Sequence, residues 1–159
     1  MNKRNLITLL LTFVACSTVF AQTIKQTINT NWEFHKGDIA GFPVSKPDTV
    51  RWEKISLPHS WNTTDVTDDE PGYYRGPGWY KKTIYVPASW QGKKIYIYFE
   101  GANQVADVYV NGRPAGKHTG GYTAFCFNIG KLLNYSDTLT ANEITVKVDN
   151  SHKIGRAHV

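Results

Sequence analysis

Residues 94–128 read KIYIYFEGANQVADVYVNGRPAGKHTGGYTAFCFN, and this stretch decides the fold. Aliphatic and aromatic side chains alternate through 95–99, which is the period-2 pattern of a strand with one buried face. The next apolar run ends at Asn111-Gly112, a pair that suits a type I′ hairpin turn because both central residues of that turn need positive φ. The stretch therefore predicts antiparallel strands at 94–99, 106–110, 113–117 and 122–128.

The rest of the chain extends the same pattern. No window keeps a helical period over three turns, and Gly and Pro divide the aromatic-rich sequence into short runs. Further strands are predicted at 32–35, 52–57, 79–86 and 143–148. Seven or eight short strands at this spacing are typical of an all-β sandwich, and residues 22–152 are enough for one domain.

Residues 1–21 are predicted to be a signal peptide, which marks the protein for export to the periplasm or the extracellular space. Lys3 and Arg4 precede an apolar run at 6–14, which is too short to span a bilayer. Cleavage is expected after Ala21. The alternative is a lipoprotein attached through Cys16, which we consider the weaker interpretation.

Residues 153–159 are expected to be an artefact rather than native sequence. The last six residues, IGRAHV, can be read back into the codons ATC GGA AGA GCA CAC GTC, which is the interior of a common short-read sequencing adapter. The triplet that follows in the adapter is a stop codon. The natural chain is therefore expected to continue beyond residue 152.

Charge argues against nucleic acid and an anionic membrane as partners. Leaving out both ends lowers the basic residues from 18 to 14, against 13 acidic ones, and a near-neutral domain has no electrostatic footprint for nucleic acid. Cys126 is the single cysteine between the two ends, which excludes an internal disulfide there. Its aromatic neighbours predict that it is a small core residue.

Six short motifs occur in an order that resembles one known family. They are LPHSW at 57–61, GWYKK at 78–82, FEG at 99–101, ADVYVNG at 106–112, HTGGYT at 118–123 and VDN at 148–150. Together they are similar to the N-terminal sugar-binding domain of family 2 glycoside hydrolases, which include β-galactosidases, β-glucuronidases and β-mannosidases. The resemblance implies a jelly-roll β-sandwich of the galactose-binding-domain type.

The resemblance also implies where the chemistry lies. Family members are retaining β-glycosidases whose two catalytic glutamates belong to a downstream (β/α)₈ barrel, which takes about 250 residues. We therefore expect no catalytic residue, no cofactor and no metal site in this chain, and no hydrolysis by the chain alone. The acidic cluster at Asp65, Asp68, Asp69 and Glu70 is interpreted as solvated surface.

A supporting role remains, on loops that reach the active-site rim in such enzymes. Candidate sugar contacts are Asp68, Tyr73, Tyr74, Arg75 and His118. Fixing the loop or the contact between domains is the alternative role for each. Thr119 departs from the Glu or Gln usual in the family, which weakens a sugar contact at that turn. An exposed aromatic patch for packing against other domains is predicted at Tyr73, Tyr74, Trp79 and Tyr80.

The leading functional prediction is an accessory domain of an exported enzyme that hydrolyses terminal β-glycosides. The remaining domains of the same chain and a carbohydrate are the expected partners. β-Galactosides are the first choice of substrate, with β-glucuronides and β-mannosides open. The alternative is a free-standing carbohydrate-binding module, because the fold alone does not separate the two functions.

Overall fold

The computed structural model describes residues 23–61, 73–138 and 140–151, and within them the chain forms strands and two short 3₁₀ helices. The strands are β1 (Trp32–Lys36), β2 (Glu53–Ile55), β3 (Pro77–Tyr85), β4 (Tyr96–Phe99), β5 (Val105–Val110), β6 (Arg113–Thr119), β7 (Phe125–Asn128) and β8 (Ala141–Asp149). The 3₁₀ helices are η1 (Ala88–Trp90) and η2 (Gly130–Leu132). All eight strands expected from the sequence are present, so the all-β prediction is confirmed.

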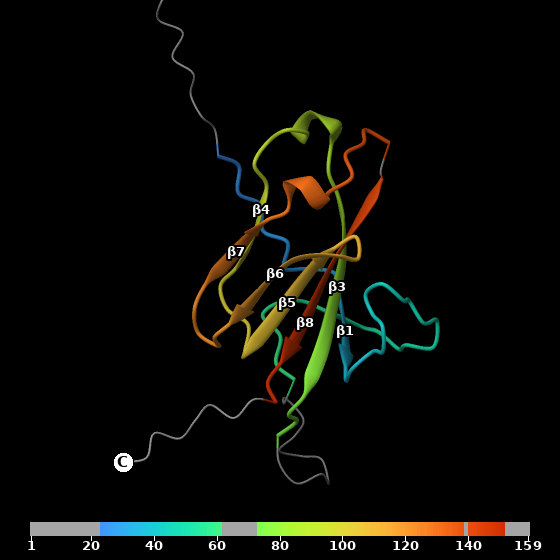
Figure 1. Ribbon diagram of the computed structural model, residues 1–159, viewed down its shortest axis with the longest axis vertical. Helices are drawn as coiled ribbons and strands as arrows, with labels where there is room; N and C mark the ends of the chain where they lie inside the picture. The colour runs from blue at the N-terminus through green and yellow to red at the C-terminus, as the bar shows by residue number, and fades with distance from the viewer. Residues whose placement is uncertain (1–22, 62–72, 139, 152–159) are drawn as a thin grey trace, which may run out of the picture.

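The strands form a six-stranded sheet in the order β2-β1-β3-β8-β5-β6 and a two-stranded sheet of β4 and β7 (Figure 1). Every strand pair in the described residues is antiparallel. The last strand, β8, lies between β3 and β5, which brings the C-terminal part of the domain into the middle of the larger sheet. This pairing joins residues that are far apart in the sequence within one sheet.

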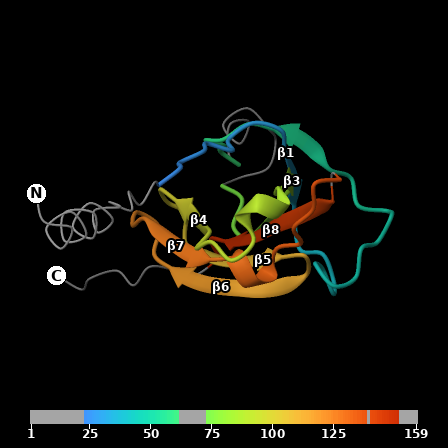
Figure 2. The ribbon, with the colours of Figure 1, turned by 90° about the horizontal axis from the view of Figure 1, so that it is seen from above.

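The core lies between the two sheets. Tyr80 of β3, Val146 of β8 and Val108 of β5 point to the same inner face and are buried. The smaller sheet packs against the β5–β6 side of the larger one (Figure 2). Contact is closest where the Phe127 ring lies over Gly116, because a Cβ atom at that glycine would come within 2.3 Å of the ring. Only glycine leaves room for this approach.

The hairpin predicted from Asn111-Gly112 is confirmed. Asn111 has φ 53° and Gly112 has φ 73°, and the turn joins β5 to β6 with Val110 opposite Arg113. Both central residues therefore have the positive φ that a type I′ turn requires.

The prediction that Cys126 belongs to the core is wrong. In β7 the exposed residues alternate with half-buried ones, and Cys126 is on the exposed side. Phe125 and Phe127 take the inner positions because successive side chains of a strand point to opposite faces. The aromatic neighbours suggested a buried cysteine, but because they occupy the inner face, the cysteine between them points outward.

The predicted exposed patch is also wrong for two of its four members. Trp79 and Tyr80 are only 2% and 9% exposed, because β3 runs between β1 and β8 and both of its faces are covered along this part. Tyr73 is 66% exposed and Tyr74 is half-buried. The sequence shows that these four aromatics are close together, but burial follows from the position of the strand in the sheet.

Segment 37–52 covers the outer face of the larger sheet, on the opposite side from the core. Phe42 packs edge-on against Trp79 with ring centroids 4.9 Å apart. Asp38 Oδ1 accepts hydrogen bonds from Lys147 Nζ at 2.8 Å and from Trp79 Nε1 at 3.1 Å. The hydrogen bond from Lys147 is the main reason why the pKa of Asp38 lies below its usual value.

Across the described residues, no helix has both the length and the apolar character that crossing a membrane requires.

Candidate functional site: the lower end of the sandwich

The candidate sugar contacts predicted from the sequence border one end of the larger sheet. Asp149 of β8 is paired with Pro77 of β3 on one side and with Val105 of β5 on the other, and Val105 is paired with Thr119 of β6. These four residues form one row across the sheet, at the ends of the strands that point downward in Figure 1, and we call this row and its loops the lower end. The turn Asn111–Gly112 lies at the opposite end of β5, which we call the upper end.

The segment 73–76 at the lower end is held by Asn150. Gly76 N donates a hydrogen bond to Asn150 Oδ1 at 2.7 Å, and Asn150 Nδ2 donates to the carbonyl oxygen of Tyr74 at 3.2 Å. The Tyr74 hydroxyl donates to the carbonyl oxygen of Pro77 at 2.9 Å, and burial raises the pKa of that hydroxyl. Tyr74 is therefore engaged in holding the segment.

Tyr73 and Arg75, on either side of Tyr74, are exposed. A tyrosine ring and a guanidinium group on a clamped backbone are suited to stacking on a sugar ring and to donating hydrogen bonds to its oxygens. The role of these two side chains, in the segment before β3, as sugar contacts stays a prediction.

His118 lies at the same end but is used differently. Its ring stacks on Phe125, with centroids 4.2 Å apart and an interplanar angle of 14°, and its Nε2 is 3.0 Å from Thr123 Oγ1. His118 therefore fixes its own turn, whereas Tyr122 on that turn is 88% exposed. The tyrosine is the large side chain of this turn that a ligand can reach.

The structure does not bring all the predicted residues together. β6, which carries His118, is separated from β3 by β5 and β8, so three interstrand spacings, roughly 15 Å, lie between them. A single monosaccharide does not bridge that distance. Asp68, like Asp65, Asp69 and Glu70, lies outside the described residues.

The motif at 57–61 supports the lower end from inside. Trp61 Nε1 donates a 2.6 Å hydrogen bond to the Tyr80 hydroxyl, and His59 Nδ1 lies 3.1 Å from the same oxygen. Burial raises the pKa of Tyr80 to about 12 and lowers the pKa of His59. Gly78 completes the fit, since a Cβ atom there would lie 2.7 Å from the Trp61 ring. The motif residues act by packing.

Sequence reasoning missed a buried amide network at the upper end. Asn142 is fully buried, and its Oδ1 accepts hydrogen bonds from Asn134 N at 2.7 Å and from Asn111 Nδ2 at 2.9 Å. Its Nδ2 donates to the Asn134 carbonyl oxygen at 2.8 Å. Asparagine is disfavoured in strands, so its presence at the start of an apolar strand was the available signal.

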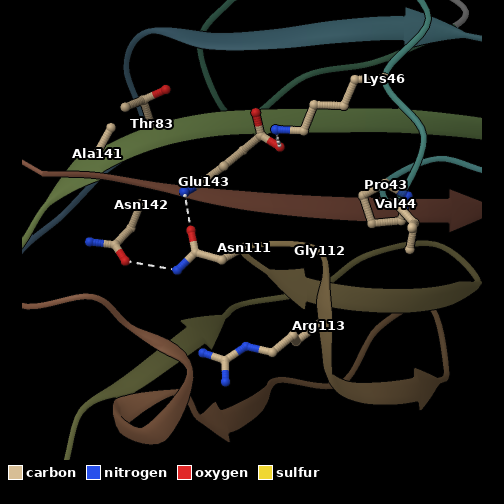
Figure 3. Close-up of a pocket in the computed structure, with 10 residues that line it drawn as sticks. All are labelled: Pro43, Val44, Lys46, Thr83, Asn111, Gly112, Arg113, Ala141, Asn142 and Glu143. Atoms are coloured by element: carbon tan, nitrogen blue, oxygen red, sulfur yellow. Dashed lines mark hydrogen bonds and ion pairs between the residues drawn. The ribbon is translucent and has the colours of Figure 1, made fainter.

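A cleft of about 490 Å³ opens on the outer face beside the upper end (Figure 3). Segment 43–46, the turn at 111–113 and the floor formed by β3 and β8 surround it. A smaller pocket of about 250 Å³ shares Lys46 and Glu143 with this cleft and extends to Phe42 and Trp52. Both hollows lie away from the candidate sugar contacts predicted from the sequence.

Metal ligands do not gather anywhere in the described part of the chain, where no group of three or more His, Cys, Asp or Glu residues could hold an ion. The predictions that the protein needs no metal and no cofactor remain predictions.

The family described as "Glycosyl hydrolases family 2, sugar binding domain" matches residues 25–154, which include nearly the whole sandwich. The chain belongs to glycoside hydrolase family 2. The resemblance inferred from the six motifs is thereby confirmed, together with the jelly-roll fold of this domain. The motifs identify the family because their order along the chain is specific, whereas no single motif is.

The relatives of this chain are named for two different enzymatic activities. A β-glucuronidase of Bacteroides fragilis is 33% identical over 96% of this chain and 20% of its own length. A β-galactosidase of Thermoanaerobacter pseudethanolicus is 38% identical over 79% of this chain and 17% of its own. The solved structure of β-glucuronidase 2 of Bacteroides uniformis, covalently bound to cyclophellitol-6-carboxylate aziridine, is 41% identical and superposes with a TM-score of 0.69 over 80% of this chain and 15% of that one.

This family 2 chain thus spans about a fifth or less of the length of the curated relatives it matches. It corresponds to their sugar-binding domain, and the relatives contain further domains.

Proposed function

We propose that this chain is the N-terminal accessory domain of an exported family 2 glycoside hydrolase that cleaves terminal β-glycosides with retention. The observation that carries the proposal is the match of one family 2 domain over nearly the whole sandwich, in a chain far shorter than its relatives. In this proposal the acid/base and nucleophile glutamates lie in a downstream barrel, and the sandwich contributes to sugar binding and to packing between domains.

The lower end is the surface that we assign to this role. Tyr73, Arg75 and Tyr122 present two aromatic rings and one guanidinium group to solvent, while Asn150 and His118 fix the backbones beneath them. Side chains that are exposed on a fixed backbone lose little conformational freedom on binding, which favours their use in recognition. The proposed partners are a β-glycoside and the remaining domains of the same polypeptide.

Two substrate classes enter the proposal on equal terms. The family resemblance makes β-galactosides the first choice, and relatives named as β-glucuronidases support β-glucuronides to the same extent. Assays of the full-length gene product with nitrophenyl β-galactoside, β-glucuronide and β-mannoside will separate the substrates. Hydrolysis of none of the three by a folded full-length protein would contradict the proposed activity.

The chain alone is expected to be inactive in the same assays, because the two carboxylates that retention needs, about 5–5.5 Å apart, are assigned to the downstream barrel. Turnover by the purified chain that disappears in D68N, D69N or E70Q variants would place the chemistry in this domain instead. Export is tested separately, by fusing residues 1–30 to a reporter enzyme that is active only outside the cytoplasm. Cytoplasmic retention of that fusion would contradict the proposed localisation.

A further inference from the structure

The outer-face cleft has a floor of two polar side chains from neighbouring strands. Thr83 of β3 and Glu143 of β8 are directly opposite each other in the strand register, which places their Cβ atoms roughly 5 Å apart on one face. Lys46 reaches over from segment 43–46 and puts its Nζ 2.8 Å from Glu143 Oε1 (Figure 3). A hydroxyl, a carboxylate and an ammonium group therefore converge on the same hollow.

These groups retain hydrogen-bonding capacity. Glu143 Oε1 is buried against the Lys46 ammonium, which lies 2.8 Å away, while the Glu143 side chain as a whole keeps 23% of its surface exposed. The Thr83 side chain is exposed, and its hydroxyl has no hydrogen-bond partner among the described residues. The exposed part of the carboxylate, the Lys46 ammonium and the Thr83 hydroxyl can therefore still form hydrogen bonds with a ligand.

The amides beside them are already committed. Asn111 Oδ1 accepts from Glu143 N at 2.9 Å, and its Nδ2 donates both to Asn142 Oδ1 and to the Leu132 carbonyl oxygen, each at 2.9 Å. Asn111 and Asn142 thus form a rigid wall of the cleft. The groups left for a ligand include those of Thr83, Glu143 and Lys46.

Apolar and aromatic surface adjoins this polar centre. Pro43 and Val44 line the cleft on one side, and the smaller pocket that shares Lys46 and Glu143 is lined by Phe42 and Trp52. A pyranose ring has hydroxyl groups around its edge and apolar C–H faces, so it matches a site that combines polar groups with aromatic rings. The volume of about 490 Å³ is in the usual range of small-ligand sites.

We propose that this groove, defined by Thr83, Glu143, Lys46 and the adjoining Trp52, binds a pyranose unit of a glycan. Neighbouring sugar hydroxyls donate to Glu143 and accept from Lys46, while a further hydroxyl bonds to Thr83. The site belongs to the sandwich itself. Binding here is measured without turnover, so the proposal stands or falls independently of the hydrolytic function proposed above.

The test is a titration of the ¹⁵N-labelled full chain, followed by NMR, with methyl β-D-galactopyranoside and with methyl β-D-glucuronide as probes. The expected result is a saturable, millimolar-range shift of the Thr83 and Gly112 amides and of the Trp52 indole signal. E143Q is expected to weaken binding about tenfold, because it replaces the charged acceptor of a hydrogen bond. T83V removes one hydroxyl at constant shape and is expected to weaken binding less.

The matched control is D107N. Asp107 lies on the same sheet face and has a comparable ion pair, Lys117 Nζ to Asp107 Oδ1 at 3.5 Å, with side-chain exposures of 63% and 28% against 61% and 23% for Lys46 and Glu143. It lines neither hollow, so its substitution is expected to leave the titration unchanged. If E143Q releases segment 43–46, T83V still decides the question because it leaves the ion pair in place.

Two results would overturn the proposal. The first is the absence of saturable shifts in the groove with either probe, including the case in which shifts occur only at Tyr73–Arg75 and His118–Tyr122. The second is groove binding that keeps its affinity in T83V as well as in E143Q. Preference for one of the two probes would identify the sugar without changing the site.

Discussion

The two ends of the sandwich use polar side chains in opposite ways. At the upper end, Asn142 is fully buried, and its side-chain amide forms three hydrogen bonds of 2.7 to 2.9 Å with Asn111 and Asn134. At the lower end, Asn150 clamps the backbone of 74–76, but Tyr73 and Tyr122 are exposed by 66% and 88%. One end closes on itself, and the other presents side chains to solvent.

The difference teaches how to separate structural from functional polar residues in this domain. A buried amide with all its partners in the protein has no capacity left for a ligand, and its loss leaves those partners unsatisfied. An exposed side chain on a clamped backbone contributes little to stability and remains available for binding. Substitutions at the two ends should therefore fall into distinct classes, and the following experiments test that separation.

The largest effect is expected for Asn142→Leu at the upper end. The substitution leaves the Asn134 N–H, the Asn134 carbonyl and the Asn111 side-chain amide without their partner. At about 1–3 kcal/mol for each buried unsatisfied group, partly relieved by relaxation, the free energy of unfolding should fall by about 4 kcal/mol. Urea denaturation measures this decrease, provided that the m-value is the same for the variant and the wild type. A loss below about 1 kcal/mol would show that the upper end is not closed by this network.

Tyr80→Phe comes next, because it removes the oxygen that Trp61 and His59 share while it keeps the ring in the core. The buried Trp61 N–H loses its acceptor, so a decrease of about 2 kcal/mol in the free energy of unfolding is expected. Tyr85→Phe is the control, since Tyr85 is exposed on the same strand. Equal effects of the two substitutions would contradict a structural role for the motif at 57–61.

Asn150→Ala should cost about 1 kcal/mol, because the two hydrogen bonds that it removes lie at the partly solvated lower end. The expected signature is local. Hydrogen exchange at the Gly76 amide should accelerate, while amides of β5 and β8 keep their protection. Faster hydrogen exchange throughout the sheet would contradict this separation, because it would show that the lower end contributes to global stability as the upper end does.

Tyr73→Ala and Arg75→Ala should change the free energy of unfolding by less than about 0.5 kcal/mol, as is usual for exposed positions. In the full-length enzyme the same variants should raise KM with a smaller change in kcat, because they remove binding at the rim. A stability loss comparable to that of Asn150→Ala would assign these residues to the fold and remove them from the proposed site.

The smallest effect expected is a pH dependence at His59. Burial lowers its pKa from the ordinary value of 6.5, so the unfolded chain binds more protons than the folded one just below that pH. Stability should be complete above about pH 6.5 and should decrease as the pH falls through the window between the two pKa values. Thermal melts of the wild type and of His59→Gln across this pH range measure the contribution of His59 to stability. A variant with the same pH slope as the wild type would contradict it.

Much of the fold was available from short-range patterns. Alternation at 95–99 and the Asn111-Gly112 pair depend on side-chain period and on backbone φ preferences, which are local properties, and both predictions were confirmed. The order of six motifs then gave the family, since each motif records a local packing need, such as room for Trp61 at Gly78. Of the candidate sugar contacts, Tyr73 and Arg75 are exposed as that role requires, whereas Tyr74 and His118 hold the backbone.

By itself, then, the sequence determined the strands, the hairpin turn, the sandwich and the family, because these follow from neighbours along the chain. Only the tertiary structure decided which face each residue occupies and which distant groups meet. It turned Cys126 outward, buried Trp79 and Tyr80, and enclosed Asn142. It also placed Thr83 opposite Glu143, 60 positions further along the chain, and so formed the floor of the outer cleft. Strand order fixes such pairs, and strand order depends on long-range contacts that no local pattern contains.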